Sequence, residues 1–78
     1  YGLELAYEAG RKGGSLPTVF NAANELAVSK FLNREIKYLE ITEIIEDCMK
    51  AHKNIENPTL EQILETEAAT YERINSRR

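Results

Sequence analysis

The sequence predicts a small all-α domain, built as a bundle of four to five short amphipathic helices. Apolar residues recur at spacings of three and four along most of the chain, which is the period of a helix with one buried face. Strand-like alternation never exceeds four residues, and stretches rich in glycine or proline separate the periodic segments. Because short helices are unstable alone in water, we expect their apolar faces to pack together.

The first predicted helix covers about residues 2–12. Leu3, Ala6 and Tyr7 share one face of this helix at the expected spacing. The pair Gly13-Gly14 follows, and glycines tolerate the positive φ angles at which helices commonly end. We interpret the stretch GRKGGS as a helix end and a turn, because it has neither the GK[ST] ending nor the GxGxxG spacing of a phosphate-binding loop.

The second predicted helix runs from Pro17 to about Leu32, and proline suits the first turn of a helix. On a helical wheel its apolar side chains form one broad arc, which comprises Phe20, Ala23, Ala27, Val28, Phe31 and Leu32. Asn24 lies inside this arc. We therefore expect Asn24 to point into the core and to bond a backbone group, because an unpaired buried amide costs about 1–3 kcal/mol.

Two further polar residues flank the same arc. Asn21 would cap the main part of the helix if residues 17–20 form a separate short turn, and Glu25 at the border of the arc would bind neighbouring N–H groups. Asparagines on a buried face ordinarily serve as hydrogen-bond partners within the fold. We therefore predict a structural role for Asn21, Asn24 and Glu25, and no catalytic one.

A third helix is predicted over about residues 40–53, with an apolar stripe of Ile41, Ile44, Ile45, Cys48 and Met49. Its acidic residues precede its basic ones, which complements the helix dipole and allows an ion pair between Glu46 and Lys50. The sequence TLEQ from Thr59 to Gln62 is a capping box that begins the last segment. The apolar stripe of that segment continues to the C-terminus, which is compatible with one helix, whereas Thr66 with Glu67 could begin a second one; of the two we favour a short break near residues 65–67.

Few residues suggest chemistry. Cys48 and His52 are one turn apart, but no second pair completes a metal site, so we predict a core thiol and a solvated histidine. The acidic residues of the third helix are interpreted as a solvated face. The arginines near the end, Arg73, Arg77 and Arg78, are expected to complement a helix dipole.

Size and charge exclude several classes of function. At 78 residues the chain is one domain, 1–78, too small to enclose a deep catalytic cavity by itself. Its net charge of −3 comes from mixed acidic and basic residues, which argues against nucleic acid and membrane surfaces as partners.

The single cysteine fits a reducing compartment, so we expect an intracellular protein. A start at Tyr1, directly in helical periodicity, is expected of a piece cut from a longer polypeptide.

Residues 6–41, AYEAGRKGGSLPTVFNAANELAVSKFLNREIKYLEI, resemble the start of the C-terminal helical domain of the 1-deoxy-D-xylulose 5-phosphate reductoisomerase family. Members carry the pattern P-x-V-x-N-A-A-N-E-x-A-V-x-x-F-L, which residues 17–32 match in order and spacing. An I-x-F/Y-x-x-I segment follows, matched by Ile36, Tyr38 and Ile41. The resemblance is strongest over residues 5–45, and Leu39 departs from it because members often have a threonine there.

The resemblance implies that the chain is the C-terminal part of an enzyme of non-mevalonate isoprenoid biosynthesis. That enzyme converts 1-deoxy-D-xylulose 5-phosphate to 2-C-methyl-D-erythritol 4-phosphate with NADPH and a divalent metal, magnesium or manganese. It implies as partners an N-terminal domain that binds NADPH and a central domain that supplies metal and substrate ligands. It also implies a homodimeric parent in the bacterial cytoplasm.

None of the motifs of those two domains occurs in the sequence. We therefore assign no catalytic, cofactor-binding or metal-binding residue, and we expect the fragment alone to bind no cofactor and to be inactive. The alternative hypothesis is a stand-alone helical module whose exposed apolar patch recruits a partner protein. A small nucleic-acid binder is a third hypothesis, disfavoured by the acidic balance.

Overall fold

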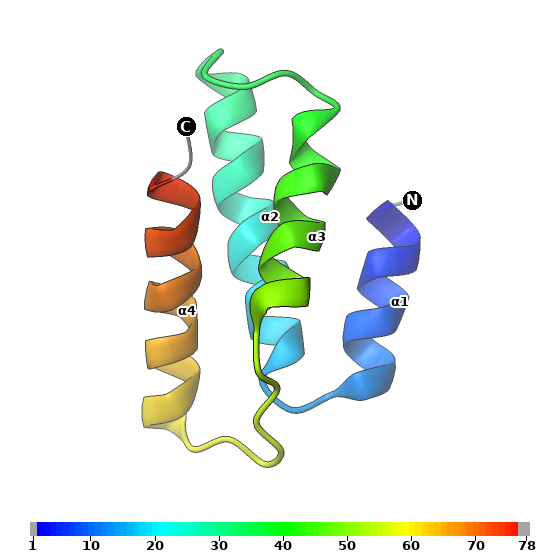
Figure 1. Cartoon of the computed structure of the whole chain (residues 1–78), viewed down its shortest axis with the longest axis vertical. Coiled ribbons are helices and arrows are strands. Elements are labelled where there is room, and N and C mark those ends of the chain that lie inside the picture. The colour runs from blue at the N-terminus through cyan, green and yellow to red at the C-terminus, as the bar shows by residue number, and fades with distance from the viewer. Residues whose placement is uncertain (1, 77–78) are drawn as a thin grey trace.

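The structure, a computed structural model, describes residues 2–76, which form four α-helices and no strand (Figure 1). The helices are α1 (Gly2–Lys12), α2 (Leu16–Leu32), α3 (Glu40–Ala51) and α4 (Leu60–Asn75). The prediction of a small all-α bundle is confirmed. Within the described residues the number of helices is four, the lower of the two numbers expected.

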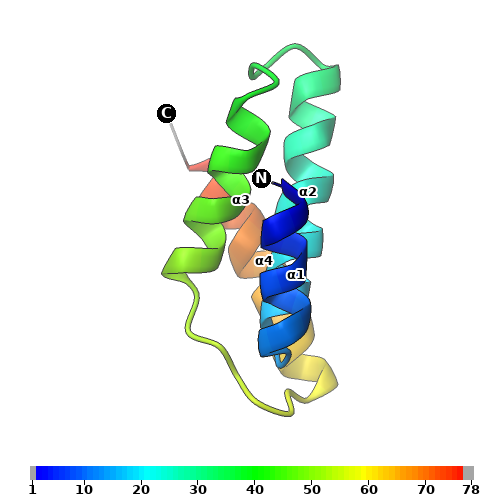
Figure 2. The ribbon, with the colours of Figure 1, turned by 90° about the vertical axis from the view of Figure 1, so that its right-hand side faces the viewer.

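The longest helix, α2, lies at the centre of the bundle and contacts each of the other three helices. Figures 1 and 2 show α1 on one side of the α2–α3 pair and α4 on the other, and the described parts of α1 and α4 make no contact. Ala22, Ala23 and Ala27 of α2 are almost completely buried. These small side chains allow close approach of the neighbouring helices on several sides of α2.

The core draws on all four helices. It comprises Leu5, Ala9, Leu16, Val19, Ala23, Ala27, Ile44, Ile45, Cys48, Met49 and Ile74. The predicted stripe of the third helix is confirmed, because four of its members are buried and Ile41 packs against the core. Cys48 is a buried free thiol, as expected.

The predicted face of α1 is wrong. Leu5 and Ala9 enter the core, whereas Leu3 and Tyr7 are each 68% exposed. Both sides of α1 carry apolar residues, so periodicity alone did not select the side that packs on α2. The large apolar side chains that remain exposed in the bundle are Leu3, Tyr7, Leu32, Tyr38, Leu39, Leu60 and Leu64.

The predicted break near residues 65–67 is also wrong, because α4 continues from 60 to 75. This stretch contains neither glycine nor proline, and Thr66 is buried rather than placed at a helix start. The hydroxyl of Thr70 donates to the carbonyl oxygen of Thr66 at 2.8 Å, a bond made within a continuous helix. The predicted capping box of Thr59 and Gln62 is confirmed, with both reciprocal hydrogen bonds present.

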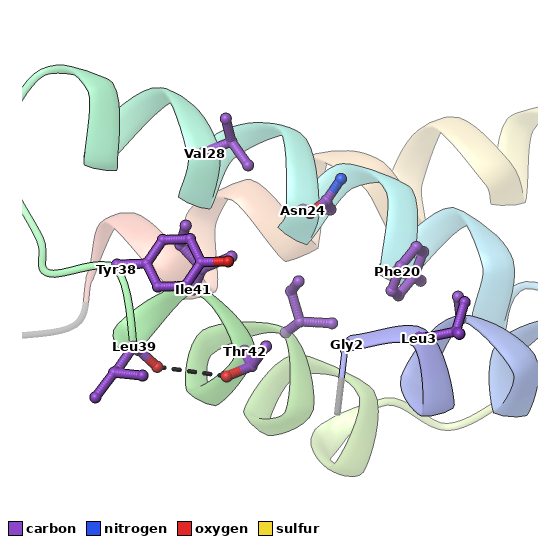
Figure 3. Close-up of a pocket in the computed structure, with 11 residues that line it drawn as sticks. Gly2, Leu3, Phe20, Asn24, Val28, Tyr38, Leu39, Ile41 and Thr42 are labelled. Atoms are coloured by element: carbon purple, nitrogen blue, oxygen red, sulfur yellow. Dashed lines mark hydrogen bonds between the residues drawn. The ribbon is translucent and has the colours of Figure 1, made fainter.

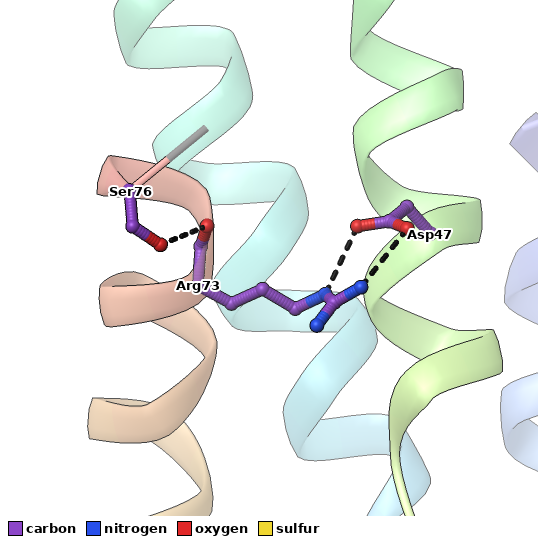
Figure 4. A network of polar contacts seen from close by, with 3 residues as sticks. All are labelled: Asp47, Arg73 and Ser76. Atoms are coloured by element: carbon purple, nitrogen blue, oxygen red, sulfur yellow. Dashed lines mark hydrogen bonds and ion pairs between the residues drawn. The ribbon is translucent and has the colours of Figure 1, made fainter. Parts of the chain in front are cut away.

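One ion pair on the surface joins α4 to α3, and another lies within α3. Arg73 of α4 donates from Nε and Nη2 to the two carboxylate oxygens of Asp47 of α3, at 3.0 and 3.2 Å (Figure 4). The predicted pair within α3 is present, with 3.4 Å between Lys50 Nζ and Glu46 Oε2. Exposed pairs of this kind contribute little to stability. The expectation for Arg77 and Arg78 lies outside the described residues.

Candidate functional site

A cluster of hydrogen bonds joins the loop before α2 to the loop after α3. We call it the loop clamp and define it as Gly13, Gly14, Ser15, His52, Asn54 and Ile55. The two loops are separated by almost forty positions in the sequence. Their union closes one end of the bundle.

Asn54 caps the N-terminus of α2 from the other loop. Its side-chain oxygen accepts from the backbone N–H groups of Ser15 and Leu16, each at 2.9 Å, and its amide nitrogen donates to the carbonyl of Gly13 at 3.1 Å. Ser15 occupies the cap position of α2 but makes no capping bond with its own side chain. Two N–H groups at this helix start are therefore bonded by a side chain that is distant in sequence, in addition to their bonds to the carbonyls of Ile55 and Gly13.

Ser15 and His52 form the centre of the clamp. Ser15 is completely buried, and its hydroxyl accepts from Ile55 N at 2.9 Å and lies 2.7 Å from His52 Nε2. Burial lowers the pKa of His52 below 6.5, which favours the neutral ring that can accept the serine proton. A serine beside a histidine resembles a nucleophile and its base, but a hydroxyl without exposed surface cannot reach a substrate. The pair is structural.

The prediction of a solvated His52 is therefore wrong. Its ring is half-buried and bonded, and α3 ends at Ala51, before the predicted end near residue 53. The backbone of His52 is extended, because the chain turns there to bring Asn54 to α2. No local spacing in the sequence signals this arrangement, since the bonded groups lie on different loops.

Gly14 is required by the clamp. Its φ is +64°, and a Cβ atom built on it would overlap the carbonyl oxygen of Ile55 and lie 2.9 Å from Asn54 Oδ1. Gly13 has the same φ but open space around it. The predicted helix end at these glycines is confirmed, and Gly13 N donates to the carbonyl of Ala9 at 3.0 Å.

A second feature is an apolar depression between α1, α2 and the start of α3, which we call the α1–α3 groove (Figure 3). Its volume is about 640 Å³. The side chains that line it include Leu3, Phe20, Asn24, Val28, Tyr38 and Leu39. The ring of Tyr38 packs edge-on against that of Phe31, with centroids 5.6 Å apart, which holds it at the rim of the groove.

The groove exists because α1 is short. α1 has 11 residues against 17 in α2, which corresponds to about 16 and 25 Å of helix. In Figures 1 and 2 the N-terminal end of α1 lies beside the middle of α3, so α1 covers only part of the surface that α2 and α3 form together. The uncovered part is the groove.

The expectation that Asn24 lies in the core is wrong. Asn24 is exposed in the α1–α3 groove and makes no side-chain hydrogen bond with another described residue (Figure 3). The centre of the buried face of α2 is displaced from the predicted arc toward Val19, Ala22 and Ala23, because three helices pack around α2. Leu32, predicted inside the apolar arc, is 72% exposed.

Asn21 and Glu25 are exposed as well. Asn21 caps no helix here, because α2 begins at Leu16 without a separate turn before it. Glu25 lies near Tyr71 of α4, where burial first, and then the charges of Glu25 and Glu67, raise the pKa of Tyr71. A structural role for Asn21, Asn24 and Glu25 in a larger protein stays a prediction.

The described residues bring together no set of three His, Cys, Asp or Glu side chains that could hold a metal ion. Among residues 2–76 no helix has the length and apolar character needed to cross a membrane.

Comparison with protein families decides the identity of the bundle. Residues 1–73 match the family model described as the DXP reductoisomerase C-terminal domain. The chain belongs to this family. The resemblance carried by residues 17–32 is thereby confirmed, and with it the interpretation of the chain as the C-terminal helical domain of a reductoisomerase.

Individual relatives agree with the family model. The chain is 57% identical to the 1-deoxy-D-xylulose 5-phosphate reductoisomerase of Agathobacter rectalis over 76 residues, which are 97% of this chain and 20% of that protein. It is 55% identical to the enzyme of Lachnospira eligens over the same shares of each chain. For Lachnoclostridium phytofermentans the identity is 59% over 91% of this chain and 18% of the relative.

The chain thus spans about one fifth of the length of these relatives. They are named as reductoisomerases, which are oxidoreductases, and the alternative of a stand-alone interaction module is not favoured. The asparagine-containing helix that identifies the family, α2, is also the helix that carries Asn24 into the groove.

Proposed function

We propose that this chain serves a 1-deoxy-D-xylulose 5-phosphate reductoisomerase as a structural domain, packed against the N-terminal and central domains of the same polypeptide. The family match over residues 1–73 is the observation that carries the proposal. A share of only 20% of each of the first relatives leaves room for two further domains in the intact protein. The exposed apolar side chains of the bundle are the surface expected of a domain that contacts others.

The intact protein converts 1-deoxy-D-xylulose 5-phosphate to 2-C-methyl-D-erythritol 4-phosphate, with NADPH as reductant and magnesium or manganese as the metal. In this proposal the N-terminal domain binds NADPH and the central domain holds the metal and the substrate. The parent is a homodimer in the bacterial cytoplasm. The role of the present chain is to support that assembly, so Asn21, Asn24 and Glu25 act on structure and not on the reaction.

The test compares the purified fragment with the intact parent at equal molar concentration. NADPH consumption with 1-deoxy-D-xylulose 5-phosphate and magnesium is measured for both, and NADPH binding to the fragment is measured by calorimetry. We expect turnover by the parent alone and no binding to the fragment. Turnover by the fragment would contradict the structural role, and an inactive parent would contradict the proposed reaction.

The gene offers an independent check. A continuous upstream reading frame that encodes GxGxxG after a predicted strand is expected, because dinucleotide-binding domains carry that pattern. A start codon at the position of Tyr1 would instead support the stand-alone module.

A further inference from the structure

The α1–α3 groove is an apolar surface that the bundle leaves open. Leu3, Tyr38 and Leu39 are 68%, 69% and 74% exposed at its edges. Leu3 comes from α1, and the adjacent pair Tyr38 and Leu39 comes from the segment that leads into α3, so the fold brings together two parts of the chain that are distant in sequence (Figure 3). Grouped apolar side chains on a small domain indicate a contact surface.

Asn24 adds a polar feature to the apolar lining. It extends from α2 between Phe20 and Val28, and its amide has no partner among the described residues (Figure 3). An amide offers two donors and an acceptor, which match the N–H and C=O groups of a peptide backbone. The groove therefore suits a polypeptide segment with apolar side chains and one accessible main-chain group.

The geometry of α1 indicates which segment that is. Gly2, the first described residue, lines the groove, and the N-terminal end of α1 lies beside the middle of α3. Any polypeptide joined to this end starts at the groove itself. About six extended residues reach about 20 Å, which is comparable to the whole length of α3.

We propose that, in the intact reductoisomerase, the polypeptide directly upstream of residue 1 lies in the α1–α3 groove. Its apolar side chains contact Leu3, Tyr38 and Leu39, and its main chain bonds Asn24. This inference rests on the proposed function. The family model is that of a C-terminal domain and the match covers 20% of the relatives, so most of such a protein precedes the matched region.

A tethered segment is favoured over a free partner on physical grounds. The upstream polypeptide is covalently attached at the edge of the groove, so its local concentration there is of millimolar order. A second copy of the chain or a separate protein must instead bear the full entropy cost of association. Docking of the tethered segment would also fix the position of the bundle relative to the domains before it.

Photo-crosslinking in the intact parent tests the proposal. Benzoylphenylalanine replaces Leu39 at the groove or, as the matched control, Leu64, which is 57% exposed on α4, the helix on the opposite side of the α2–α3 pair from α1 (Figure 1). We expect position 39 to crosslink within about ten residues upstream of residue 1, at a yield about tenfold above that from position 64. Crosslinks from position 39 to a second copy, to a distant part of the chain or to nothing would overturn the proposal.

Two substitutions in the intact parent give a second readout. Leu39→Glu is expected to lower the thermal midpoint and to speed hydrogen exchange in the upstream segment, whereas Leu64→Glu leaves that exchange unchanged. Equal effects of both substitutions on the upstream segment would contradict the docking.

Turnover of the wild-type parent separates the two proposals. An inactive parent that crosslinks as expected contradicts only the proposed reaction. An active parent without these crosslinks contradicts only the docking of the upstream segment.

Discussion

The loop clamp and the α1–α3 groove are two regions of one small bundle, and they differ in whether their side chains find partners among the described residues. In the clamp, the polar groups of Ser15 and Asn54 are bonded to backbone groups of the facing loop. In the groove, large apolar side chains are exposed and Asn24 has no partner among the described residues. The polar groups of the clamp are bonded within the chain, whereas the groove is open, and in our proposal the upstream polypeptide fills it.

The difference shows where this domain depends on its surroundings. Within the clamp Ser15 is buried and Asn54 is exposed, and among the described residues no buried side-chain nitrogen or oxygen lacks a partner. Substitutions in the clamp should therefore act on the isolated domain. Substitutions in the groove should act mainly on the intact protein.

The largest effect is expected for Gly14→Ala. The new methyl group overlaps the carbonyl oxygen of Ile55, and the φ of +64° at position 14 is strained for alanine. We expect a loss of about 3 kcal/mol or more in the free energy of unfolding, measured by urea titration of the domain. Gly13→Ala is the matched control, because it has the same φ without the overlap and should cost about 1–2 kcal/mol. Equal losses would show that the clamp does not constrain Gly14.

Asn54→Ala should have the next largest effect. It removes one of two acceptors from each of the N–H groups of Ser15 and Leu16, which keep their bonds to the carbonyls of Ile55 and Gly13, so the cap at the start of α2 is weakened. The expected loss is about 1–2 kcal/mol by the same titration. Asn54→Asp keeps the acceptor and adds a negative charge at a helix N-terminus but loses the bond from the amide nitrogen to the carbonyl of Gly13, so it should cost less stability than Asn54→Ala without matching wild type. A larger loss for Asn54→Asp than for Asn54→Ala would refute the capping role.

A smaller effect is expected on lowering the pH. Burial lowers the pKa of His52 in the folded state below its unfolded value of 6.5, so the unfolded state binds more protons in that range. Stability should therefore be full above pH 6.5 and should fall as the pH drops below it. Thermal midpoints of wild type and His52→Gln across this range test the sign. The prediction fails if the two proteins show the same dependence.

The smallest effect is expected for Asn24→Ala in the isolated domain. The side chain is exposed and makes no bond to another described residue, so the free energy of unfolding should change by less than about 0.5 kcal/mol. In the intact protein the same substitution should be destabilising, because it removes the proposed bond to the upstream segment. A marked loss in the isolated domain would place Asn24 in the core after all and would remove the contrast between the two regions.

Much of the fold could be predicted from local patterns. The end of α1 at its glycines, the capping box of α4 and the buried face of α3 all depend on residues within a few positions of one another. The face of α1 and the continuity of α4 were predicted wrongly. α1 is apolar on both sides, and the chain around Thr66 is compatible with either a cap or a helix interior. Packing against the other helices therefore determines which face of α1 is buried and whether α4 is continuous.

For the candidate site, too, local features were predictable from the sequence and long-range contacts were not. The motif of residues 17–32 was sufficient to predict the family, which comparison confirmed. The sequence did not reveal that Asn54 caps α2, nor that Asn24 is exposed, because both outcomes depend on groups far apart in the chain.

The sequence by itself determined the helical class and the family, because helix periodicity, caps and motif spacing are local properties. Only the tertiary structure decided which faces of α1 and α2 are buried, because that depends on the number and length of the helices packed around them. It turned Asn24 from an expected core residue into an exposed one, since α1 is too short to cover the surface of α2 and α3 where Asn24 lies.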